Sequence, residues 1–151
     1  MPPCDRLRRY IIGHGLTLSA PVADPETRSF EARCGLALPR ELLQFYGCVN
    51  GMAPGEMDPR NLIRLWPVKE MTPVDAGLAD SDGVRFSSEK VLLADYHYWA
   101  LAYAVRISGI AGSTVTVVGE GHELEVAQSF EEFIEMILQN DSGLFPDRGP
   151  R

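Results

Sequence analysis

Apolar residues recur at helical spacing in four segments of the chain. In the first, near the N-terminus, Leu7 and Ile11 share one face of a predicted helix. In the second, Asp24 can cap a helix that begins at Pro25 and runs to about Cys34. The pattern therefore predicts two short helices in the first part of the chain.

The third and fourth helical segments carry clearer boundaries. Pro39 opens the third, and Asn50-Gly51 ends it, because both residues tolerate left-handed backbone angles. Its expected apolar stripe is Leu42, Leu43, Tyr46 and Val49. In the fourth, Ser129 and Glu132 form a capping box ahead of a regular apolar pattern. That pattern is Phe130, Phe133, Ile134, Ile137 and Leu138.

Strand signals fill most of the remaining chain. LIRLWPV, which starts at Leu62, predicts a strand that Pro67 ends or pushes to a sheet edge. Further strands are expected at 91–96, 98–105, 114–118 and 123–127, with a turn at 119–121 and Leu124 and Val126 pointing inward. Residues 72–90 are polar and turn-rich, which indicates a long loop, and residues 140–151 should form a frayed tail.

The order of these elements indicates an α+β fold. Helices come first, then an antiparallel meander, then a final helix. We expect an antiparallel-rich twisted sheet with helices packed mainly on one face. The length of 151 residues suits one domain spanning residues 1–151, large enough to bury a core without disulfides.

The charge of the chain narrows the classes of partner. Fourteen basic and 21 acidic side chains give a net charge of −7, which repels phosphate backbones and disfavours nucleic-acid binding. A basic protein would be attracted, although the same charge can serve solubility alone. The apolar stretch after the N-terminal arginines is too short for a membrane span, and three cysteines without CxxC spacing fit a reducing compartment. We therefore expect a cytoplasmic protein that binds no membrane.

No motif for catalysis, nucleotide binding or metal binding occurs in the sequence. There is no GxxxxGK[ST] phosphate loop, no HExxH pair and no GxSxG elbow. The histidines and cysteines lack metal-ligand spacing: His14, His97, His122, Cys4, Cys34 and Cys48. We expect no catalytic residue, no cofactor and no metal.

The run GLALPRELLQFYGCVNGM, from Gly35 to Met52, resembles the signature of the SUKH superfamily. That signature places Leu-Pro at a helix start, an aromatic pair near its end, and then Asn-Gly. The matching residues are Leu38, Pro39, Phe45, Tyr46, Asn50 and Gly51. We interpret these motif residues as mainly structural.

Later pieces of the chain match the same superfamily in order, so that the resemblance covers about residues 24–139. These pieces are Glu70, Leu93-Ala94-Asp95, the aromatic strand Tyr98–Val105, Ala127, Ser129, Phe130 and Phe133. One departure is Met52-Ala53-Pro54, which stands where the superfamily usually has glycines.

The resemblance implies protein binding rather than catalysis. Bacterial SUKH proteins look like immunity proteins of polymorphic toxin systems, which neutralise toxins, often nucleases, by direct contact. The fungal branch resembles a regulator of cell-wall glucan synthesis (Smi/Knr type). We expect an immunity protein whose partner is a basic toxin domain; a cell-wall-synthesis regulator or scaffold, a small-ligand-binding protein and a small hydrolase are the alternatives.

Seven residues are candidates for contact with that partner. Three are acidic residues of the expected long loop, where binding residues often lie: Asp75, Asp80 and Asp82. The others lie near expected sheet ends and could supply a charged rim and an aromatic anchor: Glu70, Asp95, Tyr96 and Tyr98. Trp99, by contrast, is interpreted mainly as a strand residue, because aromatic rings suit sheets.

Overall fold

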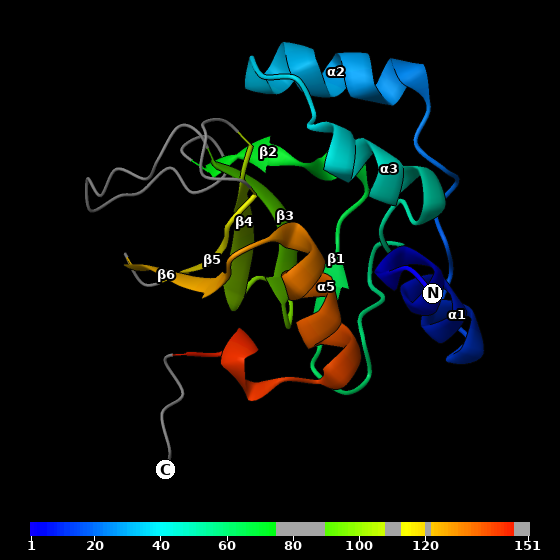
Figure 1. Ribbon diagram of the computed structural model, residues 1–151, viewed down its shortest axis with the longest axis vertical. Helices are drawn as coiled ribbons and strands as arrows, with labels where there is room; N and C mark the ends of the chain where they lie inside the picture. The colour runs from blue at the N-terminus through cyan, green and yellow to red at the C-terminus, as the bar shows by residue number, and fades with distance from the viewer. Residues whose placement is uncertain (75–89, 108–112, 120–121, 147–151) are drawn as a thin grey trace.

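The computed structural model describes residues 1–74, 90–107, 113–119 and 122–146, and their arrangement confirms an α+β fold. Its α-helices are α1 (Pro3–Gly13), α2 (Asp24–Cys34), α3 (Arg40–Cys48) and α5 (Phe130–Gln139). Two short 3-10 helices are η1 (Val68–Glu70) and η2 (Ser142–Leu144). Figure 1 shows α5 across one face of the sheet with α3 and α1 beside it, so the helices gather mainly on that face, as predicted.

The described strands form one antiparallel sheet of six. They are β1 (Ile63–Leu65), β2 (Thr72–Pro73), β3 (Lys90–Tyr96), β4 (Leu101–Arg106), β5 (Val115–Gly119) and β6 (His122–Ala127). Their order is β1-β3-β4-β5-β6, and β2 pairs with β3 further along the same edge. The first half of the sheet is therefore built on β3, whose residues carry both short strands on one side and β4 on the other.

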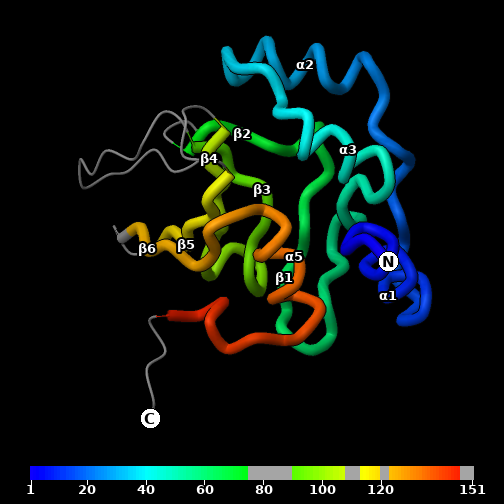
Figure 2. The backbone as a smooth tube through the Cα atoms, viewed as in Figure 1, coloured from blue at the N-terminus to red at the C-terminus, as the bar shows by residue number. Residues whose placement is uncertain are grey.

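The larger core lies between the helices and the sheet. Its centre is the apolar face of α5, where Phe130, Phe133, Ile134 and Ile137 are buried as predicted. α1 adds the fully buried Leu7 to the same core. Figure 2 shows that α1 lies beside α3 in the fold, although the 26 residues 14–39 separate the two helices in the sequence.

A smaller core lies on the opposite face of the sheet. Its buried members are Trp66, Val74, Leu92, Ala102, Ala104 and Val118. Small side chains of β4 alternate with larger ones that point to the helices, which is the period of two expected of a strand. The two faces therefore carry two separate clusters, and Trp66 is the largest side chain of the smaller one.

The apolar stripe of α3 differs by one residue from the predicted one. Leu43, which we expected to face inward, is 38% exposed, whereas Phe45 is 8% exposed. The buried positions Leu42, Phe45, Tyr46 and Val49 follow the i, i+3, i+4, i+7 spacing of one helix face. Leu43 lies about 100° away from Leu42 around the axis, so it cannot share that face.

Several predicted boundaries also move. The N-cap of α2 is Ala23 without a side-chain cap, so Asp24 is the first helical residue rather than the cap. Leu124 pairs with the buried Val117 but is 38% exposed, because β6 is the last strand at that edge of the sheet. The loop expected at 72–90 begins instead with β2, and its residues 75–89 lie outside the described part of the chain.

Part of the segment predicted to be a frayed tail, residues 140–151, forms the short helix η2 (Ser142–Leu144). Leu144 is fully buried, and the Tyr103 hydroxyl donates a hydrogen bond to its carbonyl oxygen at 2.8 Å. A buried tyrosine needs such a partner, and the segment after α5 provides it. Among the described residues, no helix is both long enough and apolar enough to cross a bilayer.

The two neighbouring leucines of α3 test this packing. Leu42→Ala should lower the free energy of unfolding by about 2–5 kcal/mol, because it leaves a cavity in the core. Leu43→Ala should cost less than about 1 kcal/mol, because that side chain already contacts water. Chemical denaturation of both variants measures the difference. Equal losses, or a larger loss at Leu43, would show that α3 faces the core differently.

Candidate interaction site

The turn between β3 and β4 carries three consecutive residues with left-handed backbone angles. The φ angles are 45° at His97, 55° at Tyr98 and 71° at Trp99. The prediction that Tyr98 and Trp99 belong to a strand is therefore wrong, since β4 begins only at Leu101. Left-handed angles are uncommon in bulky residues and persist only where the surroundings hold them.

Backbone hydrogen bonds hold this turn at both ends. The His97 amide donates to the Leu62 carbonyl at 2.9 Å, which ties the turn to the residue before β1. The Ala100 amide donates to the Tyr96 carbonyl at 3.0 Å, which closes the turn on itself. The turn is thus fixed both within the hairpin and against the neighbouring strand.

The carboxylate of Asp95 adds a third restraint beneath the turn. One oxygen, Oδ2, accepts a hydrogen bond from the Trp99 amide at 3.0 Å, and the other, Oδ1, accepts one from Trp66 Nε1 at 2.5 Å. The indole rings of Trp66 and Trp99 lie 4.7 Å apart between centroids. Asp95 therefore joins the smaller core to the turn by binding both tryptophans.

The side chains at the top of the turn remain exposed. Tyr98 is 68% exposed and Trp99 51%, whereas Trp66 below them is 2% exposed. Large aromatic side chains that are rigidly held and open to solvent are typical anchors of protein interfaces. We take the aromatic turn, residues 96–99, as the candidate interaction site. The aromatic run in the sequence marks this segment, but nothing in it signals a left-handed turn, so Trp99 was missed.

The other candidate contact residues are placed differently from one another. Asp95 is only 5% exposed, so the structure shows it supporting the turn rather than facing solvent. Tyr96 is half-buried, with its ring 4.9 Å from that of Phe145. Glu70 forms a bidentate ion pair with Arg64, whose two terminal guanidinium nitrogens lie 2.9 and 2.7 Å from the carboxylate oxygens, so the negative charge of Glu70 is largely balanced. The three acidic loop candidates, Asp75, Asp80 and Asp82, lie outside the described residues.

The Asn-Gly pair after α3 packs against the chain segment that carries Trp66. Gly51 has a φ of 74°, and a Cβ there would lie 2.4 Å from backbone atoms of both Trp66 and Pro67. Asn50 is 2% exposed; its Nδ2 donates to the Ala20 carbonyl at 2.9 Å and its Oδ1 accepts from the Val68 amide at 3.0 Å. These two residues therefore seat the end of α3 against the segment that carries Trp66.

The remaining motif residues serve the larger core. Leu38 and Tyr46 are buried, and Pro39 is the N-cap residue of α3. The Tyr46 hydroxyl has no hydrogen-bond partner among the described residues, and burial raises the pKa of Tyr46. At the end of the motif set, Ser129 Oγ accepts from the Glu132 amide at 3.0 Å, which is the predicted N-cap of α5.

A family model for the SMI1 / KNR4 family (SUKH-1) matches residues 21–136. The chain belongs to this family. The matched span contains the Asn-Gly pair and the aromatic turn, and it begins after α1. SUKH-1 proteins are generally non-catalytic. A search of the curated proteins found no match.

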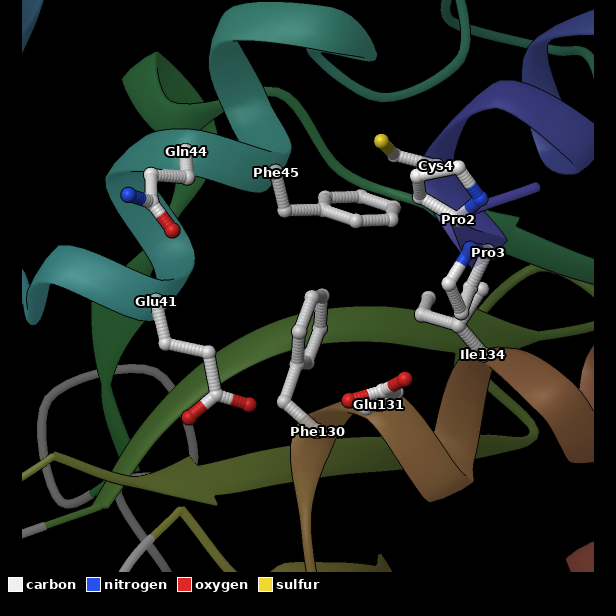
Figure 3. Close-up of a pocket in the computed structure, with 9 residues that line it drawn as sticks. All are labelled: Pro2, Pro3, Cys4, Glu41, Gln44, Phe45, Phe130, Glu131 and Ile134. Atoms are coloured by element: carbon white, nitrogen blue, oxygen red, sulfur yellow. The ribbon is translucent and has the colours of Figure 1, made fainter.

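This SUKH-1 protein also has a shallow hollow between α1, α3 and α5 (Figure 3). Its volume is about 220 Å³, and its apolar floor is formed by Phe45, Phe130 and Ile134. The phenyl rings of Phe45 and Phe130 meet edge to face at 4.8 Å, with Glu41 and Glu131 at the sides. Pockets for drug-sized ligands usually measure about 300–1,000 Å³ and contain several convergent polar groups. Two like-charged carboxylates beside two rings do not make such a set.

A group of potential metal ligands lies at the junction of α1 and α3. The ligand atoms of Cys4, Asp5 and Cys48 all lie within 4.8 Å of one another. Cys48 Sγ donates to Asp5 Oδ1 at 3.5 Å, and burial together with these two neighbours raises the pKa of the Cys48 thiol to about 12. Sequence spacing could not reveal the group, because Asp5 and Cys48 are 43 positions apart.

Two glycines near the end of α3 test the seating of the Asn-Gly pair. Gly51→Ala should destabilise the protein by well over the ~1 kcal/mol typical of point substitutions, because its Cβ would overlap backbone atoms. Gly47→Ala is the matched control, since no atom lies within 4 Å of a Cβ there. It should be neutral or stabilise by about 0.5–1 kcal/mol, because alanine favours a helix. Thermal unfolding measures both, and similar behaviour of the two variants would contradict the contact.

The carboxylate beneath the turn can be tested separately. Asp95→Ala should cost about 1–3 kcal/mol, because it leaves the buried Trp66 Nε1 without an acceptor. Asp95→Asn retains one acceptor oxygen and should cost less. Near-ultraviolet circular dichroism reports the packing of the two tryptophans alongside the denaturation midpoint. An unchanged aromatic signal in Asp95→Ala would mean that this carboxylate does not hold the turn.

Proposed function

We propose that this SUKH-1 protein is an immunity protein that neutralises a cognate toxin domain by direct binding. The observation that carries the proposal is the aromatic turn, which presents Tyr98 and Trp99 to solvent on a restrained backbone. Membership of the SUKH-1 family supports a protein of the immunity or Smi1 type. The exposed side chains of Tyr98 and Trp99 would give such a protein a surface for binding its target.

The physical properties of the turn suit a protein interface. Tyrosine and tryptophan contribute most often to the few residues that dominate binding energy, because each removes a large area from water. The turn is already held by Asp95 and by the Leu62 carbonyl, so little conformational entropy should be lost when a partner binds. Tyr98 and Trp99 are therefore the anchors of the proposed interface.

The charge of the chain supports a basic partner. A toxin domain that acts on nucleic acid must carry positive charge to bind phosphates, and a protein with a net charge of −7 complements it. Such a long-range field accelerates association, whereas close contacts at the centre set the dissociation rate. Because exposed charges are screened over about 8–10 Å at physiological salt, association should slow as salt rises.

Of the two alternatives, the described residues give less support to one and do not separate the other from an immunity protein. A small-ligand or enzymatic role needs convergent polar groups in a pocket, and the hollow between α1, α3 and α5 is small and apolar. A Smi/Knr-type regulator of cell-wall synthesis would also bind proteins, and only the identity of the partner separates it from an immunity protein. We place the protein in the cytoplasm, where its three free cysteines would stay reduced.

The aromatic anchors provide the test of this function. The candidate partner for this test is a toxin domain encoded by a gene next to the gene for this chain. The toxin domain is produced in growing cells with and without this chain. Wild-type protein should restore growth and bind the purified toxin domain. Tyr98→Ala and Trp99→Ala should each weaken binding by at least about 2 kcal/mol, roughly thirty-fold in Kd, by calorimetry.

Leu124→Ala is the matched control, because this apolar side chain is also exposed but lies on β6, away from the turn. It should leave both binding and rescue unchanged. Tyr98→Ala is less prone to disturb folding than Trp99→Ala, because Tyr98 is the more exposed of the two side chains, so it keeps the binding test interpretable. Full rescue and unchanged affinity in both aromatic variants would overturn the assignment of the turn, and toxin binding without any rescue would overturn the immunity function.

A further inference from the structure

The junction between α1 and α3 brings together three groups that metals favour as ligands. Cys4 and Asp5 lie in the first turn of α1, and Cys48 is the last residue of α3. Their two sulfur atoms and a carboxylate oxygen lie within 4.8 Å of one another. Ligands of a tetrahedral zinc ion, bound at about 2.3 Å to sulfur and 2.0–2.2 Å to oxygen, lie roughly 3.3–3.8 Å apart. Small side-chain rotations would therefore bring these atoms into place.

We propose that Cys4, Asp5 and Cys48 form a binding site for Zn²⁺. Two thiolates select a borderline or soft cation over Mg²⁺ and Ca²⁺, which prefer oxygen ligands. Three protein ligands leave the fourth tetrahedral position to water. The thiols must release their protons when the ion binds, so affinity rises with pH. The sequence-based expectation of no metal depended on ligand spacing along the chain, whereas this group forms only by packing.

The surroundings hold the ligands in position without the ion. α1 is anchored by the buried Leu7 and Ile11 and by a hydrogen bond from the Tyr10 hydroxyl to Asp58 Oδ1 at 3.0 Å. An ion pair between Arg6 and Glu135 joins the same helix to α5. Figure 3 shows the sulfur of Cys4 on the side of α1 that faces α3. Cys4 and Cys48 are partly buried while Asp5 is exposed, so an ion can reach the group from solvent.

The charges around the group balance the complex. Two thiolates and a carboxylate carry three negative charges, so a bound Zn²⁺ leaves one. Arg8 and Arg9 line a surface hollow together with Asp5 and can offset that charge. The same arginines repel a free cation, which lowers affinity relative to an all-acidic surrounding. The three ligand residues belong to α1 and α3, whereas the aromatic turn joins β3 to β4, so the zinc proposal does not depend on the proposed toxin binding.

Cobalt provides the direct probe, because Co²⁺ takes zinc sites and gives near-ultraviolet absorption when thiolates bind it. Reduced, chelator-treated full-length chain should bind one equivalent of Co²⁺ with this thiolate absorption, and Zn²⁺ should displace it. Cys4→Ser and Cys48→Ser should abolish the absorption, and Asp5→Asn should weaken binding several-fold. Zn²⁺ should also raise the thermal midpoint of the wild type, because ligands that bind only the folded state stabilise it.

Cys34→Ser is the matched control, because Cys34 is a partly buried helical cysteine of α2 outside the ligand group. It should retain the cobalt absorption and the thermal shift. The proposal is overturned if the wild type shows no thiolate–cobalt absorption, if Cys34→Ser removes it, or if Cys4 and Cys48 merely form a disulfide in air without binding metal. Cys4→Ser keeps the test decisive if Cys48→Ser fails to fold, since circular dichroism identifies that failure.

Discussion

The contact between Gly51 and the backbone of Trp66 and Pro67 fixes the relation of the helices to the sheet edge. With only 2.4 Å available to a Cβ, no other residue fits there without moving the chain. Asn50 completes the contact by bonding the Val68 amide, so that the end of α3 and the start of η1 are joined through one side chain. Trp66 follows β1 directly, and its side chain lies in the smaller core on the opposite face of the sheet from α5.

Trp66 is in turn connected to the exposed aromatic turn through Asp95. Its indole nitrogen is bound by Asp95, and Asp95 in turn binds the backbone of Trp99. The family motif, which looks purely structural in the sequence, thus lies at the base of a continuous set of contacts that ends at the exposed aromatic turn. By contrast, the larger core under α5 lies on the opposite face of the sheet, so the proposed interaction site is supported by a different cluster from the one that forms the larger core.

The sequence predicted the elements whose signals are local. Helical spacing and the capping box located α5, and alternation located most of β3 to β5, because these patterns need no knowledge of distant residues. It failed where packing decides. The burial of Asp95 depends on what packs around it, and the left-handed angles of His97 to Trp99 depend on the Leu62 carbonyl and on Asp95. The Cys4–Cys48 junction likewise exists only once α1 packs on α3.

In the aromatic turn, the groups that fix the backbone conformation differ from the Tyr98 side chain that is exposed to solvent. The hydrogen bonds that hold it involve the backbone of residues 97, 99 and 100 and the Asp95 carboxylate, all of which surround position 98. The side chain of Tyr98 is 68% exposed, so its identity has little effect on that support. Under the function that we propose, the side chain at position 98 could vary to suit a particular partner while the backbone that presents it stays fixed. In the interface that we propose, the net charge would set the association rate of a basic partner, and the side chains at positions 98 and 99 would set its dissociation rate.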